Sequence, residues 1–497
     1  MKFKEYNQKQ QWLIPPNIED EIPKGDICRV IDESVEAIDL TCIESKFREE
    51  GNPAYHPKMM LKIILYSYAK GIYSSRKIAQ ELESNIFYWY LSGRQKPDFR
   101  TTCLFRSRHA NELKDVFQEV VRLCLKLGVA KLLTVAIDGT KIKANADKEK
   151  LRSQEWIEAR IKEESDAIDK VLEKARLTDE EEDRLYGVDK REDELPEELR
   201  DPIKRREKLR QIKEEMERED KKIINETDHD ARLMKSHDGF QLGYNCQAVA
   251  DAGSQVILAA NVCTEGHDQH QLKRNMEELK TVCGDKPQTL LADAGYFCGF
   301  NLQYLKEENI YGLIPNRSTR NIAMEADATL PDHLRFKKEQ FQYIVDKDLY
   351  ICPEDKELTR VGSFSEVFVR KSGATTSTVR YQCHDCLDCK FMLICCRSKS
   401  QRSIRRYDDE LLRQEMINRL KSKEGSALYK QRFKTSEPIF GNIKQNLGFR
   451  KFSLRGLIKT RGEFFLITMV HNLYKIQKHL KGDIEWSTSL KLGYQTA

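Results

Sequence analysis

Hydrophobic positions in the first 128 residues recur every three or four residues, which is the spacing of α-helices. One such run covers residues 57–71 and closes on a glycine, and two serines are placed to cap a second run over residues 76–84. Two short helices joined by a tight turn predict a helix-turn-helix. A longer helix is predicted over residues 99–128, after a Lys-Pro-Asp breaker. We therefore expect an N-terminal helical domain over residues 1–128.

From residue 129 the pattern changes to short apolar runs, which are typical of buried strands. The run 132–140 carries Asp138 and Gly139 near its end, and the run 288–296 carries Asp293 in a similar position. The remaining pattern predicts a strand hairpin, a helix and a last strand, over residues 243–265, 267–284 and 310–316. This order predicts an α/β fold with a mixed sheet, helices on its faces and acidic residues at strand ends.

Two segments interrupt the α/β pattern. Residues 148–232 mix acidic and basic residues densely, which predicts long polar helices, arranged as a hairpin that breaks near Pro196. Residues 317–426 hold six cysteines. We therefore expect the first core strand in 129–147, a charged helical insertion in 148–232, the rest of the core in 233–316, a cysteine-rich insertion in 317–426 and C-terminal core helices in 427–497.

The composition is that of a soluble protein with several domains. A chain of 497 residues is too long to form a single hydrophobic core of ordinary size. Of its residues, 39% are hydrophobic and 33% are charged. The sequence has no run of eighteen apolar residues and no apolar secretory signal at its start. We expect no membrane span and a cytoplasmic location, in which the fourteen cysteines are reduced, buried or metal-bound.

Positive charge is concentrated towards the C-terminus. Between Arg397 and Arg461 there are 18 Lys or Arg residues against 6 Asp or Glu residues, a balance of +12 in a chain whose total is +5. Such a segment favours a polyanionic partner, above all nucleic acid. Arg100 and Arg106, near the start of the predicted helix 99–128, are further candidates for phosphate contacts. A basic surface without a partner and a plain helical bundle are the alternatives.

The aspartates near the strand ends suggest a metal site. If their strands are neighbours, Asp138 and Asp293 converge at one edge of the sheet, where Mg²⁺ would neutralise their repulsion. A third carboxylate, Glu437, precedes a proline where the pattern predicts a helix that starts near Ser436. Three carboxylates would complete a site for two metal ions that cleaves phosphodiesters. Ordinary turn aspartates and a glutamate that only favours a helix N-terminus are the alternatives.

Three sequence blocks together resemble bacterial insertion-sequence transposases with an Asp-Asp-Glu site, in particular the group numbered eleven eighty-two. The blocks are VAIDGTKIKANA, LLADAGYF and YKQRFKTSEPIFGNIKQNLGFRKFSLRG. The third block resembles the Tyr-Arg-Glu-Lys signature of these enzymes, with one extra residue between arginine and glutamate. The matching positions are Tyr429, Arg432, Glu437 and Lys444. The YHPKMMLKIILY region resembles the N-terminal domain of the same group.

The resemblance implies a ribonuclease-H-like core and a DNA transposase. Such an enzyme binds the terminal inverted repeats of its own element, cuts phosphodiester bonds at the ends and joins the freed 3′-hydroxyl to target DNA. Asp138, Asp293 and Glu437 would hold two Mg²⁺ ions, for which Mn²⁺ is a possible substitute. Tyr429, Arg432 and Lys444 would position the DNA strand. The resemblance also implies a homodimer on paired ends, without a nucleotide cofactor, in a bacterial cytoplasm and on the nucleoid when bound to DNA.

The cysteine-rich segment is a candidate zinc site. Its cysteines are Cys352, Cys383, Cys386, Cys389, Cys395 and Cys396. Their close spacing is consistent with a tetrahedral thiolate site, to which the distant Cys352 can add one ligand. Related transposases carry a similar insertion, which favours structural zinc. Six candidates exceed four ligands, so the choices between Cys383 and Cys386 and between Cys395 and Cys396 stay open, and reduced buried thiols are the alternative.

Two other functions remain open at this stage. A ribonuclease-H-fold nuclease would cleave DNA without strand transfer. A non-catalytic descendant would bind DNA through its helical head and its zinc module alone. Intact acidic residues in all three blocks argue against the non-catalytic descendant.

Overall fold

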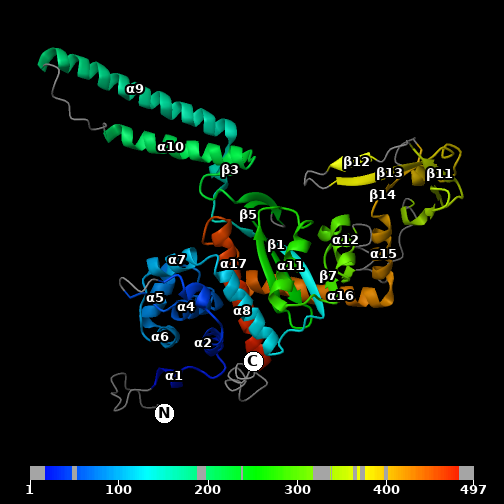
Figure 1. Ribbon diagram of the computed structural model, residues 1–497, viewed down its shortest axis with the longest axis horizontal. Coiled ribbons are helices and arrows are strands. Elements are labelled where there is room, and N and C mark those ends of the chain that lie inside the picture. The colour runs from blue at the N-terminus through cyan, green and yellow to red at the C-terminus, as the bar shows by residue number, and fades with distance from the viewer. Residues whose placement is uncertain are drawn as a thin grey trace, which may run out of the picture.

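The computed structural model of the chain describes residues 17–47, 53–186, 197–236, 239–316, 336, 338–361, 366–369, 375–396 and 401–480. Its central sheet has the strand order β6-β5-β1-β7-β8, with β4 paired to the start of β5 (Figure 1). The strands are β1 (Thr134–Lys143), β4 (Arg232–Ser236), β5 (Gly239–Asp251), β6 (Ile257–Cys263), β7 (Thr289–Leu291) and β8 (Tyr311–Leu313). β1, β5 and β6 are antiparallel neighbours, whereas β7 and β8 run parallel to β1. The predicted mixed α/β fold is confirmed, and this strand order is consistent with a ribonuclease-H-like core.

The N-terminal helices form a bundle beside the sheet. They are α1 (Ile18–Glu21), α2 (Ile27–Ala37), α3 (Thr41–Glu44), α4 (Pro57–Ala69), α5 (Ser75–Ser84), α6 (Ile86–Ser92), α7 (Phe99–Arg108) and α8 (Leu113–Lys126). The single helix predicted over 99–128 is two helices, α7 and α8. The turn between them lies against α17 (Leu457–Leu480), because a Cβ atom on Gly462 would come within 2.8 Å of Ala110 Cα. The break therefore coincides with close packing against α17. No local sequence pattern predicts this contact.

α17 joins the bundle to the sheet. It packs against α2, α4 and α8 on one side and against the edge strand β6 on the other (Figure 1). At that edge the buried side chain of Asn472 satisfies both backbone groups of Ile257, accepting from its N–H and donating to its C=O, each at 2.8 Å. An unpaired strand edge is thereby covered. No helix in the described part of the chain has the length and hydropathy needed to cross a membrane.

A pair of long helices projects from the body between β1 and β4. These helices are α9 (Gln154–Tyr186) and α10 (Glu197–Arg218), and the short strands β2 (Leu151–Ser153) and β3 (Ile223–Asn225) pair at their base (Figure 1). They have their own small core, which includes Ile157, Ile212, Met216 and Ile224. The predicted break near Pro196 lies in residues 187–196, which are outside the described part of the chain.

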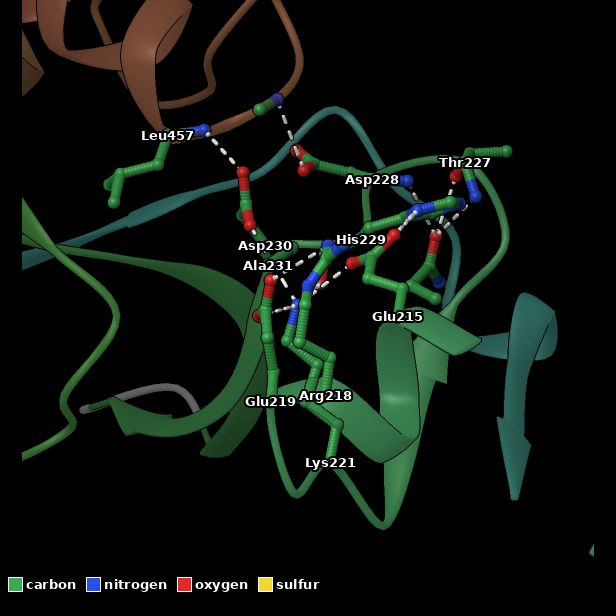
Figure 2. A network of polar contacts seen from close by, with 12 residues as sticks. Glu215, Arg218, Glu219, Lys221, Thr227, Asp228, His229, Asp230, Ala231 and Leu457 are labelled. Carbon is green, nitrogen blue, oxygen red and sulfur yellow. Dashed lines mark hydrogen bonds and ion pairs between the residues drawn. The ribbon is translucent and has the colours of Figure 1, made fainter. Parts of the chain in front are cut away.

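A network of polar contacts fixes the base of this helix pair to the body (Figure 2). Asp228 and Asp230 accept hydrogen bonds from the backbone N–H groups of Gly456 and Leu457, at 3.1 and 2.8 Å. These donors open the first turn of α17, where carboxylates are favoured. Lys221, which is buried, pairs with Glu215 at the end of α10 at 2.9 Å. These contacts therefore attach the base of the helix pair, at the last turn of α10, to the first turn of α17.

The second sheet has the order β12-β13-β11-β10-β9, with β14 added to β13. Its strands are β9 (Gln342–Ile344), β10 (Leu349–Ile351), β11 (Glu357–Arg360), β12 (Glu366–Val369), β13 (Thr375–Cys383) and β14 (Ser403–Tyr407). α12 (Gly299–Glu307) lies between β7 and β8 along the chain, and α15 (Glu410–Lys421) leads back from this sheet to the core, where α16 (Lys423–Gly441) follows (Figure 1).

The helix predicted to start near Ser436 starts thirteen residues earlier. Ser422 caps α16 by accepting from the N–H of Gly425 at 3.0 Å, and Pro438 lies inside the helix. Proline has no N–H, which leaves the carbonyl of Lys434 without its usual helical donor. Gln255 supplies that donor through its Nε2 atom at 2.7 Å. A π-helical turn over Asn442–Asn446 then ends the segment.

Candidate active site

Asp138 lies in β1, and Asp293 follows the end of the neighbouring parallel strand β7. The register pairs Ala136 of β1 with Leu291 of β7, and each aspartate comes two residues after its member of that pair. β7 ends at Leu291, whereas β1 continues to Lys143 beside β5. The prediction that Asp138 ends its strand is therefore wrong, because it is β7 that ends. The charge of Asp293 nevertheless acts on the Asp138 carboxyl group and raises its pKa.

Gly139 serves close packing within the central sheet. Its backbone is extended within β1, directly opposite Gln247 of β5. A Cβ atom at this position would lie 2.3 Å from Gln247 Nε2 and 2.8 Å from Asp268 Oδ1. Both distances are shorter than real Cβ contacts. Glycine is required because two polar side chains lie against the strand.

Asp268 is an acidic residue near this site that the sequence analysis missed. It lies in the loop between β6 and α11 (Gln271–Cys283). Its Oδ1 atom accepts hydrogen bonds from Asn245 Nδ2 at 2.8 Å and from Gln247 Nε2 at 2.7 Å. One signal was available: Asn245 and Gln247 are two amides in an apolar strand, and buried amides need partners.

Asp138 is difficult to ionise where it lies. Burial is the main cause that raises its pKa to about 6, and the charges of Asp293 and Asp268 act in the same direction. The Arg432 guanidinium opposes them, and its terminal nitrogen lies 3.0 Å from Asp138 Oδ2. The ionisation of Asp138 is thus influenced by two other carboxylates and by one close arginine. A perturbed carboxyl in such surroundings is a typical feature of a functional site.

Tyr429 and Arg432 lie on the buried face of α16. Arg432 reaches β1 through its ion pair with Asp138, and its Nε atom is buried without a hydrogen-bond partner within the described residues. Tyr429 is 3% exposed, and its ring packs edge-on against Phe433 with centroids 5.9 Å apart. Arg432 therefore touches the candidate site directly, whereas Tyr429 helps to hold α16 in place.

Lys444 and Glu437 follow Arg432 along the same segment. Lys444 Nζ donates to Thr140 Oγ1 at 2.5 Å and to the carbonyl of Lys141 at 3.1 Å. Thr140 comes two residues after Asp138 and shares its face of β1. Contacts from Arg432 and Lys444 to this face bracket Glu437 in the sequence. The Glu437 side chain is exposed, and it makes no hydrogen bond or ion pair within the described part of the chain.

The acidic residues fit a divalent cation in their chemistry but do not form a finished site. Carboxylate oxygens are the donors that Mg²⁺ prefers, and a cation beside Asp138 would offset the repulsion that raises the pKa of this carboxyl group. Among the described residues, however, no three acidic, histidine or cysteine side chains are already arranged to hold a metal ion. The three predicted carboxylates therefore do not all converge, because Glu437 makes no contact with the two aspartates.

The two candidate DNA-binding arginines of α7 differ in exposure. Arg100 is exposed, and its guanidinium lies 5.7 Å from the ring centre of Phe99. Arg106 is 3% exposed and donates to the hydroxyl oxygens of Tyr68 at 3.0 Å and Ser75 at 2.5 Å. Its burial argues against the predicted phosphate contact, because these bonds use its guanidinium to hold α7 against α4 and α5.

The six cysteines of the second sheet line one small cavity. Its volume is about 20 Å³, which is the room that a single water molecule or ion needs. Cys352 Sγ accepts the N–H groups of Glu354 and Lys356 at 3.4 and 3.3 Å. Burial raises the pKa of Cys383 to about 12, so a metal would be needed to deprotonate it at neutral pH. All fourteen cysteines of the chain are free of disulfides.

The mixed sheet and its acidic edge define an α/β protein with a candidate cation-binding site beneath a basic helix. Residues 351–477 match the family model of the transposase DDE domain, and residues 16–108 match the transposase domain DUF772. The first match contains Glu437, whereas Asp138 and Asp293 lie outside both. Together the two matches indicate a DDE transposase of an insertion sequence. No curated protein and no solved structure matches the chain.

Proposed function

We propose that this chain binds the terminal inverted repeats of its own element, cleaves phosphodiester bonds at the element ends and transfers the freed strand into target DNA. Asp138, Asp293 and Glu437 are the proposed catalytic carboxylates. The observation that supports the proposal is that Asp138 and Asp293 each come two residues after a paired position of β1 and β7, while Arg432 and Lys444 contact the face of β1 that carries Asp138. The specific group numbered eleven eighty-two and its Tyr-Arg-Glu-Lys signature remain part of this proposal.

Two Mg²⁺ ions, or Mn²⁺ in their place, would activate the nucleophile and stabilise the leaving oxygen when bound. Asp138 and Asp293 supply carboxylates from the sheet, and Glu437 supplies the third from α16. Arg432 forms an ion pair with Asp138, and its buried Nε–H group, which has no partner among the described residues, would donate to a phosphate oxygen. Lys444 would hold a phosphate of the same strand, and Tyr429 would position the helix that carries these groups.

Other parts of the chain are proposed to bind and shape the DNA complex. The N-terminal helices, with exposed Arg100, would recognise the terminal repeats, and the basic C-terminal segment would add sequence-independent affinity. The cysteine-lined cavity would hold structural zinc, which is supported by its size and by the backbone donors to Cys352. The transposition reaction joins two ends, so we propose a homodimer on paired ends.

The test is cleavage of a labelled DNA fragment that carries the terminal repeats flanking the gene, with Mg²⁺ or with EDTA. Glu437→Gln should abolish metal-dependent cutting at the repeat ends. Glu424→Gln is the matched control, because Glu424 is an exposed glutamate in the first turn of the same helix. Cutting that survives in Glu437→Gln would return Glu437 to a surface role. Glu463 could not replace it, because that carboxylate is fully buried and bonded to Ser453.

A nuclease without strand transfer is the second candidate, favoured by the same acidic edge. Supplying donor and target DNA together separates the two. Joined products indicate a transposase, whereas cut donor ends without joined products indicate a nuclease.

A further inference from the structure

We propose that the cleft between the second sheet and α15 binds single-stranded DNA, with a base against its aromatic rings and a phosphate on Arg406. The inference rests on the proposed DNA-processing function and adds to it a separate site for an unpaired strand. The cleft has a volume of about 630 Å³, which is within the range of about 300–1,000 Å³ in which proteins hold organic ligands. α15 runs beside it from the second sheet back to the core (Figure 1).

Arg406 lies on the inner face of the second sheet and lines the cleft. It follows the buried Ile404 by two residues in β14, so both side chains share one face, whereas Arg405 lies on the exposed face. The Arg406 guanidinium lies 4.0 Å from the centre of the Tyr343 ring. It forms no ion pair within the described part of the chain, and its Nε atom is buried without a hydrogen-bond partner there. A buried N–H group without an acceptor costs free energy, which a phosphate oxygen would offset.

The cations that line the cleft are not fully balanced by acids. Lys338 pairs with Glu410 at 2.6 Å. Arg413 is held by Asp409 through two contacts of 2.5 and 2.7 Å. Burial is the main cause that lowers the pKa of Lys338, and the charges of Arg413 and Arg406 lower it further, although Glu410 opposes them. An anionic ligand would offset this repulsion between the three cations.

Aromatic rings from the second sheet and from the core line the same cleft. Tyr343 of β9 is fixed by its hydroxyl group, which donates to Asp348 at 2.6 Å. The Arg413 guanidinium lies 5.3 Å from the centre of the Phe297 ring and 4.6 Å from the centre of the Tyr407 ring. A wall of rings and cations suits a single strand, because its bases stack on the rings while its phosphates pair with the cations. A double helix keeps the faces of its bases inside the duplex.

The cleft lies close along the chain to the candidate active site. Phe297 follows Asp293 by four residues, so their Cα atoms are at most about 14 Å apart. On the other side, α15 leads directly into α16, which carries Arg432. A strand whose end is processed at the carboxylates would therefore have a second point of attachment nearby.

The test measures binding of labelled oligothymidylate to the full chain by fluorescence anisotropy, beside a duplex of the same length. We expect Arg406→Gln to weaken binding of the single strand about tenfold and to leave binding of the duplex nearly unchanged. Arg405→Gln is the matched control, because it removes the same charge from the exposed face of the same strand, and it should bind the single strand almost as tightly as the wild type. Equal losses in the two variants, or equal losses for single strand and duplex, would overturn the proposal.

Phe297→Leu tests the aromatic wall in case the arginine variant does not fold. It keeps an apolar side chain but removes the ring, and the affinity for the single strand should again fall about tenfold. Thymidine monophosphate should compete only at much higher concentrations, because it lacks the neighbouring phosphates. Competition at concentrations similar to those of the oligonucleotide would indicate a site for free nucleotides and contradict the assignment to a strand.

A further measurement needs no variant. Oligothymidylate that carries iodouracil forms covalent bonds with nearby aromatic side chains under ultraviolet light, and we expect adducts on peptides that contain Tyr343, Tyr407 or Phe297. Adducts confined to other peptides would rule out this cleft. A protein that binds the single strand here but never cleaves its repeat ends would refute the proposed function while leaving the cleft as a binding site.

Discussion

Acidification should loosen the contact between α17 and the turn that carries Lys444, through His471. The imidazole is 1% exposed, its Nε2 atom lies 2.9 Å from the carbonyl of Gln255, and its Nδ1 atom lies 3.1 Å from Asn442 Nδ2. A neutral ring with its proton on Nε2 satisfies both neighbours, since Nε2 donates and Nδ1 accepts. Protonation would place a proton on Nδ1, opposite the N–H donor of Asn442 Nδ2. Burial of the ring lowers the pKa of His471 to about 4.

The sign and size of the effect follow from that pKa. The unfolded chain protonates His471 below its usual value of about 6.5, whereas the folded chain does so only below about 4. The unfolded state therefore binds more protons in this window, and stability falls as the pH falls. Between pH 8 and pH 5 the loss is about 2 kcal/mol. Asp138, whose pKa is raised to about 6, changes in the opposite direction and gains about 1 kcal/mol.

Because these two effects partly cancel, the informative quantity is the difference between wild type and His471→Gln. Urea unfolding should be followed by circular dichroism at pH 8 and pH 5 for both proteins. We expect the wild type to lose about 2 kcal/mol more than the variant between the two pH values. His479→Gln, an exposed histidine of the same helix, should behave as the wild type. Parallel losses in wild type and His471→Gln would refute the reasoning.

Three further changes have clear expected outcomes. Asn472→Leu should lower the free energy of unfolding by about 2–5 kcal/mol in urea titrations, because the N–H and C=O of Ile257 lose their buried partners; a loss below that of an exposed substitution would contradict this. Arg106→Gln should lower the melting temperature, whereas Arg100→Gln should leave it unchanged and reduce the salt dependence of DNA binding by about one charge; equal melting curves would argue against the structural role of Arg106. Purified protein should contain zinc by mass spectrometry, and the double variant Cys383→Ser/Cys386→Ser should lose it; wild-type protein without zinc would leave the thiols as reduced core residues.

Elements set by local patterns were predictable from the sequence. The hairpin of β5 and β6 follows from two apolar runs around an Ala-Gly-Ser turn, and the separate helices α4 and α5 follow from helical spacing with a glycine and serines between them. Arg432 and Lys444, which contact β1, were also singled out through the resemblance, although the start of α16 was not predicted. Ser436 and Pro438 look like a helix start, but Gln255 replaces the bond that Pro438 cannot make.

The rest of the site depends on contacts between distant segments. Gly139 looks like a turn residue until Gln247 and Asp268 are seen packed against it, more than a hundred residues away in the chain. Arg106 looks exposed by its charge until the hydroxyl groups of Tyr68 and Ser75 account for its burial. Neither contact leaves a periodic trace in the sequence, because each is made by single residues from separate elements.

The position of α17 at the end of the fold has a consequence for synthesis on the ribosome. The bundle of α2, α4 and α8 and the strand β6 all pack against α17. The residues of α17 leave the ribosomal exit tunnel after every other described part of the chain. Until then both apolar faces are exposed, and such surfaces invite aggregation or chaperone binding. A chain that lacks α17 therefore cannot yet hold β6 against the bundle, so the nascent protein acquires its complete core only after residues 457–480 have been synthesised.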